Sequence, residues 1–179
     1  MTSMGIRLIF FIALAIISFG CSGVRVLDTE ADAGFKLSQY QTFDFFKLEA
    51  SGDTTENFEK NANLMKQSIS RELQSKGLRP ATGNPDLLVN IGIVVNEQVQ
   101  TRETTIQEAP RYMGQRRYRW KSEEVEVGKY REGTVTVDLV DPASDKMVWK
   151  GVVEGIIPRK EEQLKATIDD GVRSLFEKL

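Results

Sequence analysis

The chain has 179 residues, of which 24 are Lys or Arg and 26 are Asp or Glu, for a formal net charge of −2 at pH 7. This length suits one domain with a sizeable core, and the near-neutral charge gives no electrostatic argument for a nucleic-acid partner. The sequence contains no histidine. The commonest general base and the commonest metal ligand are therefore missing. These features favour a non-enzymatic binding protein without a cofactor.

Residues 1–20 have the pattern of a signal peptide, with Arg7 ahead of the apolar run Leu8–Phe19. As a helix, this run would extend about 18 Å, which is short of the ~30 Å hydrocarbon core of a membrane. It ends at Gly20, directly before Cys21, the single cysteine of the chain.

The segment resembles the lipobox of bacterial lipoproteins, in which the cysteine is lipidated and becomes the first mature residue. Ser18 stands where the strict pattern has leucine, and looser versions occur in the Bacteroidetes-type group. The alternatives are an ordinary secretory leader with a chance cysteine, or an N-terminal anchor helix.

The lipoprotein resemblance implies two or three acyl chains, which attach a protein stably to a membrane. Ser22, in place of an aspartate, resembles the sorting pattern for the outer membrane, and no acidic cluster follows Cys21. We therefore expect a periplasmic-facing outer-membrane protein whose first partner is the membrane, through lipidated Cys21. Residues 21–38 are small and polar, which predicts a tether, and residues 39–179 then form a single domain.

The aromatic segment Tyr40–Leu48 predicts a strand, with Phe43 and Phe45 on one face and Phe46 and Leu48 on the other. Residues 55–76 carry apolar side chains at helical spacing, which predicts an amphipathic helix that ends at Gly77. Its apolar stripe is Phe58, Ala62, Met65, Ile69 and Leu73.

Alternating apolar residues over 87–95 predict a strand. The polar residues 97–108 indicate that this strand continues beyond the body of the domain or gives way to a mobile loop. Residues 133–141 and 146–155 predict a β-hairpin around a polar turn, with Met147, Trp149 and Val153 on one face. Residues 160–178 predict a second amphipathic helix. The expected fold is α+β, an antiparallel β-sheet with two amphipathic helices packed on one face.

Several of these segments resemble the bacterial lipoprotein family known as domain of unknown function 4136. The resemblance covers roughly residues 25–179, and its motifs are structural. It implies an envelope lipoprotein of Bacteroidetes-like bacteria or their relatives, and it supplies no catalytic residue. The segments that carry it are Tyr40–Leu48, Lys76-Gly77-Leu78, Pro85-Asp86-Leu87-Leu88-Val89, Gly133-Thr134-Val135, Leu139-Val140-Asp141 and Val148-Trp149-Lys150-Gly151.

A run of basic and aromatic residues is the candidate contact surface for a ligand or partner. Arginine beside an aromatic ring can hold phosphate or sugar by forked hydrogen bonds and stacking. The alternative is a hairpin arm whose arginines pair with nearby glutamates, such as Glu97, Glu103 and Glu123–Glu126. The run comprises Arg111, Tyr112, Arg116, Arg117, Tyr118, Arg119, Trp120 and Lys121.

Asp138, Asp141 and Asp145 surround the predicted hairpin turn, but their spacing lacks the dense oxygen ligands of a calcium loop. We therefore predict no metal site and interpret Asp141 as a turn residue. The sequence favours a lipid-anchored protein that binds an unidentified envelope protein, lipid or glycan. The alternative is a carboxylate-dependent enzyme acting on an envelope glycan or small molecule.

Overall fold

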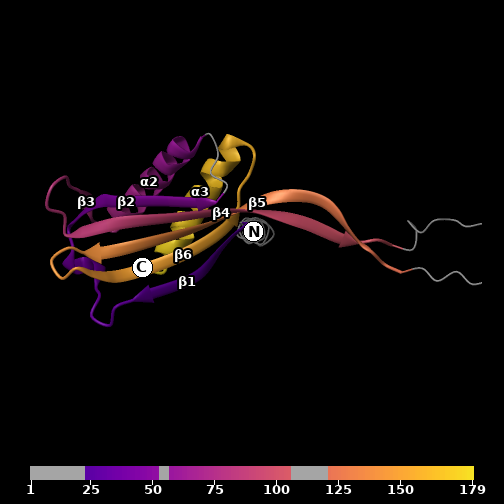
Figure 1. Ribbon diagram of the computed structural model, residues 1–179. Helices are drawn as coiled ribbons and strands as arrows, with labels where there is room; N and C mark the ends of the chain where they lie inside the picture. The colour runs from indigo at the N-terminus through magenta and orange to yellow at the C-terminus, as the bar shows by residue number, and fades with distance from the viewer. Residues whose placement is uncertain (1–22, 53–56, 106–120) are drawn as a thin grey trace, which may run out of the picture.

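The computed structural model describes residues 23–52, 57–105 and 121–179. In these residues a six-stranded sheet carries two helices on one face (Figure 1). The α+β class and the placement of both helices are thereby confirmed. The strand order is β1-β6-β5-β4-β2-β3, with β1 Val24–Ala31, β2 Thr42–Gly52, β3 Arg79–Pro80, β4 Leu87–Glu103, β5 Glu124–Asp141 and β6 Lys146–Ile156.

The sheet is mixed rather than purely antiparallel. Strands β1, β6, β5 and β4 pair antiparallel, whereas β2 pairs parallel with both β4 and β3. Helix α2 (Phe58–Ser75) connects β2 to the β3–β4 segment. It returns the chain to the end of the sheet at which β2 began, so β2 pairs parallel with both strands. The expectation of a wholly antiparallel sheet is therefore wrong for strands β2 and β3.

The predicted tether is also wrong in part. Residues 24–31 form β1, an edge strand that pairs antiparallel with β6, from Val24 opposite Gly155 to Ala31 opposite Trp149. Val24 and Val26 pack against the core. The segment looked like a tether because its outward-facing residues are polar. An edge strand needs few apolar side chains when one of its faces is open to water.

Because of two β-bulges, some side chains of β2 and β6 lie on the opposite face of the sheet from the one predicted. In β2, Phe45 pairs with Val89 and Lys47 with Asn90, so Phe46 is the extra residue and is 70% exposed. The bulge brings Leu48 to the helix side, where it packs against the core. Its predicted position on the face opposite Phe43 is therefore wrong.

A bulge in β6 has the same effect on the hairpin. Leu139 pairs with Trp149 and Val140 with Met147, which leaves Val148 as the extra residue. Trp149 and Val153 are buried as predicted, but Met147 is 44% exposed and does not share their face. The β5–β6 hairpin itself is confirmed.

The two helices run in the same direction across the sheet. Helix α2 buries Ala62, Met65, Ile69 and Leu73, and Gly77 follows it with a φ of 98°. Lys60 near the start of α2 forms an ion pair with Glu161, the first residue of α3 (Glu161–Phe176), with an N–O distance of 2.6 Å. Both helices therefore begin at the same end of the sheet.

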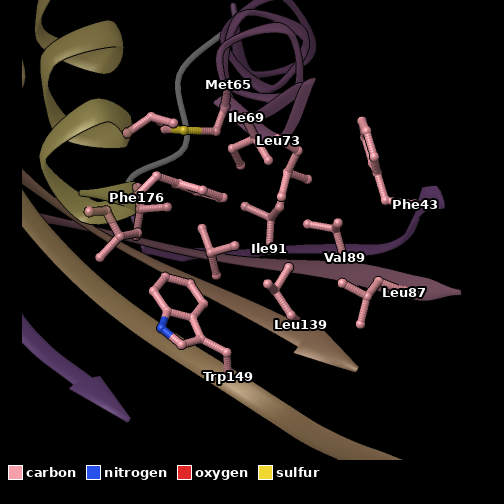
Figure 2. Close-up of a cluster of buried hydrophobic side chains, with 14 of the residues drawn as sticks. Phe43, Met65, Ile69, Leu73, Leu87, Val89, Ile91, Leu139, Trp149 and Phe176 are labelled. Atoms are coloured by element: carbon pink, nitrogen blue, oxygen red, sulfur yellow. The ribbon is translucent and has the colours of Figure 1, made fainter. Parts of the chain in front are cut away.

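The core lies between these helices and the central strands (Figure 2). The helix-facing side chains of β4 include Leu87, Val89 and Ile91, and each of these three is at most 2% exposed. Trp149 packs beside Phe176 of α3, with ring centroids 5.7 Å apart.

Strands β4 and β5 continue beyond the other strands as a two-stranded ribbon (Figure 1), here called the arm, residues 96–105 and 121–132. The backbone N–H of Thr104 donates to the carbonyl of Glu123 near the end of the described part. The first of the two predictions for this segment, a strand that runs beyond the domain body, is confirmed.

Candidate functional site

A cavity of about 250 Å³ lies between the helices and the sheet, at the end where α2 and α3 begin and the arm leaves the body. Most of its lining is apolar and comes from both helices and from the sheet. The apolar lining residues include Met65 of α2, Ile93 of β4, Val135 of β5, Val153 of β6, and Leu164 and Ile168 of α3.

Glycines shape the walls of this cavity. A Cβ atom added to Gly133 of β5 would lie 3.1 Å from the Ile157 side chain. A Cβ added to Gly171 of α3 would lie 3.3 Å from Val24. A glycine inside a helix costs about 1 kcal/mol relative to alanine. At Gly171 the absence of a side chain lets α3 approach the start of β1 closely.

Charged side chains surround the mouth of the cavity. Two of them are carboxylates, and each already pairs with a cation: Glu161 with Lys60 at 2.6 Å, and Glu154 with Arg25 at 2.8 Å. Arg131 and Arg159 also line the cavity, and neither guanidinium forms an ion pair with a carboxylate in the described parts of the chain. The mouth therefore presents two arginines next to an apolar interior.

The first residue of β1 belongs to the same site. Val24 lines the cavity and is three residues after Cys21. Three extended residues span about 10 Å. The position at which we expect lipidation is therefore within about 10 Å of the Cα atom of a cavity-lining residue.

Most of the residues selected from the sequence lie outside the described residues. These are Cys21, Arg111, Tyr112, Arg116, Arg117, Tyr118, Arg119 and Trp120. Lys121 is described, and it is exposed at the far end of the arm. Glu97, one of the carboxylates considered as a partner for the arginines, accepts a hydrogen bond from Lys129 at 2.7 Å. This bond raises the pKa of Lys129.

The three aspartates near the hairpin turn have separate roles. Asp141 accepts hydrogen bonds from the Ala143 N–H at 2.8 Å and the Ser144 hydroxyl at 2.9 Å, and these bonds lower its pKa. Asp141 is thus a turn residue, as predicted, and Asp145 adopts a φ of 52° in the same turn. The described residues contain no group of three or more His, Cys, Asp or Glu placed to hold a metal ion.

Asp138 lies on the face of the sheet opposite the helices, paired in register with Asn90 of β4 and Lys150 of β6. Burial raises the pKa of Asp138, and the positive charge of Lys150 acts against this effect. Within the described residues, Asp138 Oδ1 and Asn90 Oδ1 are buried without a hydrogen-bond partner. Asp138 is therefore remote from the cavity, on the other side of the sheet.

The cavity was not predicted from the sequence. Its lining residues are spread from Val24 to Val172, and only the folded chain brings them together. The local signal that was available is the alternation of β5, which places Arg131 on the same side as Gly133 and Val135. None of the helices in the described parts of the chain is long and apolar enough to span a membrane.

Comparison with protein families identifies the family of this chain. The family described as Domain of unknown function (DUF4136) matches residues 27–179. The protein belongs to this family, as the resemblance in the sequence indicated. Comparison of the sequence with curated proteins gives no match.

Solved structures with a similar arrangement share little sequence with this chain. A PDZ domain protein from Parabacteroides distasonis has 15% identity and a TM-score of 0.49, and the match covers 91% of this chain and 38% of that one. The PelC dodecamer from Paraburkholderia phytofirmans has 14% identity and a TM-score of 0.45 over 87% of this chain and 97% of the other. A minor lipoprotein from Acinetobacter baumannii has 12% identity and a TM-score of 0.37 over 78% and 90% of the two chains.

Proposed function

We propose that this protein is a lipid-anchored protein of the bacterial envelope, on the periplasmic face of the outer membrane, and that it binds an apolar envelope ligand without transforming it. The observation that carries the proposal is the apolar cavity of about 250 Å³ beside the start of β1. Ligand sites are typically concave and mostly apolar, with a few polar groups that orient the ligand.

The lining of the cavity favours a lipid over a glycan or a peptide. Most of the lining is apolar, and Asn57, Asn61, Thr167 and the charged residues make up the rest. A sugar needs many hydrogen-bonding groups along its length, so the mainly apolar lining suits a hydrocarbon chain better. Binding is also favoured over carboxylate catalysis, because Glu154 and Glu161 at the mouth are each held by a cation.

The anchor is tested by fractionating cells that express the Cys21→Ala variant. We expect the variant to move from the membrane to the soluble fraction, since no acyl chain can then be attached at residue 21. Ser22→Ala is the matched control, because it changes the neighbouring residue and keeps the cysteine. A Cys21→Ala protein that fractionates with membranes as fully as wild type contradicts the anchor.

The cavity is tested with the uncharged fluorescent probe N-phenyl-1-naphthylamine and the full chain. Ile93→Phe adds an aromatic ring on the cavity side of β4 and should weaken probe binding about tenfold or more. Val94→Phe is the matched control, because Val94 is 41% exposed on the opposite face of the same strand. Equal probe affinity in the two variants would count against the cavity as the binding site.

The arm provides a second candidate surface. It carries Thr105 and Lys121, the described residues on either side of residues 106–120, away from the body of the domain, and Lys121 is the last residue of the basic and aromatic run. Replacing Arg116, Arg117 and Arg119 together with glutamine should weaken binding to phosphatidylglycerol vesicles. The control replaces the exposed residues Lys36, Lys146 and Lys178 with glutamine, which removes the same charge elsewhere on the surface. Unchanged vesicle binding in the arginine variant would end this idea.

A further inference from the structure

We propose that the cavity selects an acyl chain with an anionic head group, and that Arg131 and Arg159 bind the head. This inference rests on the proposed function and names the class of ligand. The mainly apolar lining and the two arginines without an ion-pair partner support it, and both features belong to described residues.

The interior of the cavity suits a hydrocarbon chain. Its deeper wall is formed by Val153 of β6 together with Ile168 and Val172 of α3, each less than 10% exposed. No charged side chain is buried among these residues, and their apolar surface offers no hydrogen-bond partner to water. A chain of methylene groups matches such walls, whereas a polar ligand would lose its hydration without compensation.

The mouth suits an anion. Lys60 and Arg25 are occupied by Glu161 and Glu154, so the charges at the mouth that remain without an ion-pair partner in the described residues are the guanidinium groups of Arg131 and Arg159. Glu97 lies opposite Arg131 in the sheet register, but its carboxylate is bound by Lys129.

A guanidinium presents a planar fork of N–H donors that matches a carboxylate or a phosphate. The main chain of Arg131 is held at the edge of the cavity, because its carbonyl accepts a hydrogen bond of 2.8 Å from the Ile157 N–H. The head of a ligand whose chain fills the cavity would therefore meet the arginines at the mouth.

The acyl chains of the protein's own anchor are the competing occupant, since Val24 at the mouth is three residues after Cys21. A glyceride linked to the cysteine through a thioether has no anionic head at this position. It would leave both arginines without a counter-charge, which favours a separate anionic amphiphile.

The experiment compares laurate with dodecanol as competitors of N-phenyl-1-naphthylamine, using the full chain with Cys21→Ala. We expect laurate to bind at least tenfold more tightly than dodecanol. In the double variant Arg131→Gln with Arg159→Gln, laurate affinity should fall about tenfold while dodecanol affinity stays the same. Unchanged dodecanol affinity shows that the cavity has kept its shape. The control is Lys146→Gln with Lys178→Gln, which removes the same charge elsewhere.

Equal affinities for laurate and dodecanol, or a loss of both ligands in the arginine variant, would overturn the inference while leaving the proposed function in place. Uptake of laurate by the Cys21→Ala protein but not by the lipidated protein would show that the anchor fills the cavity, which also overturns it. If neither protein binds the naphthylamine probe, the proposed function itself fails, and the inference fails with it.

Discussion

Gly151 shows how closely the core of this protein is packed. It lies on β6 below the Trp149 ring, and an added Cβ would come within 2.5 Å of that ring and 2.6 Å of Leu175. Because both neighbours are buried, neither can move away easily. We expect Gly151→Ala to lower the free energy of unfolding by about 1–3 kcal/mol, the usual cost of overpacking a core.

Urea denaturation of the full chain measures this effect, with Gly92→Ala as the control. Gly92 also lies inside a strand, but its added Cβ would meet Thr136 at an ordinary distance of 3.7 Å. A similar change in both variants would show that backbone entropy, rather than contact with Trp149, determines the result.

Asp138 makes stability depend on pH. Its pKa is raised in the folded protein by burial, so the unfolded chain loses this proton at lower pH than the folded one. Stability therefore falls as the pH rises from the ordinary pKa of an aspartate through the raised value. Asp138→Asn should be more stable than wild type at neutral pH, and the difference should disappear in acid.

Thermal unfolding at pH 7 and near pH 3.5 tests this expectation. Asp28→Asn on the exposed strand β1 is the control and should change little at either pH. A constant difference between Asp138→Asn and wild type at both pH values would contradict the role assigned to burial.

At the scale of elements, Asp169 joins the two helices. Its carboxylate pairs with Arg71 of α2 and, at 2.6 Å, with Lys165 of α3. Burial acts to raise the pKa of Asp169, but hydrogen bonds from Lys165 and Ser68 and the charge of Arg71 outweigh it, so the pKa is lowered. We expect Asp169→Asn to cost about 1 kcal/mol at neutral pH, the upper end for partly exposed ion pairs.

Because the folded pKa is lowered, this contribution is present above the ordinary pKa of an aspartate and is lost as the pH falls through the folded value. The difference between Asp169→Asn and wild type in urea denaturation should therefore shrink in acid. Asp170→Asn is the control, since its pair with Arg173 is more exposed and lies within α3. An effect of equal size at Asp170 would refute the link between the helices.

The sequence predicted both helices, the hairpin and the strand over residues 87–95 because each has a strong apolar period. The continuation of that strand into the arm was one of two alternatives for a polar segment. The sequence did not predict the bulges at Phe46 and Val148, since a bulge reverses the alternation without any local mark in the sequence. Strand β1 was missed for a related reason. An edge strand exposes most of its side chains, so its composition resembles that of a linker.

The candidate site was harder to predict than the elements. Arg159 has nothing in its local sequence that separates it from other surface arginines, and for Arg131 the alternation of β5 indicates only the face of the strand. Their significance comes from tertiary structure, which places them around the same cavity as Val24 and leaves both carboxylates at the mouth paired with other cations. The basic and aromatic run 111–121 was more conspicuous in the sequence because its residues are contiguous, and its role as a contact surface stays a prediction.

At the scale of the whole molecule, the start of β1 and the base of the arm lie at the same end of the sheet (Figure 1). Val24, Arg131 and Gly155, which line the cavity, belong to this end. The β5–β6 turn at residues 142–145 lies at the opposite end. If Cys21 carries the lipid, about 10 Å of extended chain connects the membrane surface to this end of the domain. We therefore expect the mouth of the cavity to face the membrane.

This orientation is tested with the lipidated protein on lipid bilayers that contain a nitroxide-labelled head group. A fluorophore is attached to a cysteine introduced by Glu162→Cys, near the mouth, or by Ala143→Cys, at the far turn; both positions are exposed. Since lipidation consumes the thiol of Cys21, each variant has one site for the label. Nitroxide quenching falls steeply with distance, so the label at residue 162 should be quenched several-fold more strongly. Equal quenching at the two positions, or stronger quenching at residue 143, would show that the short connection does not hold the cavity toward the membrane.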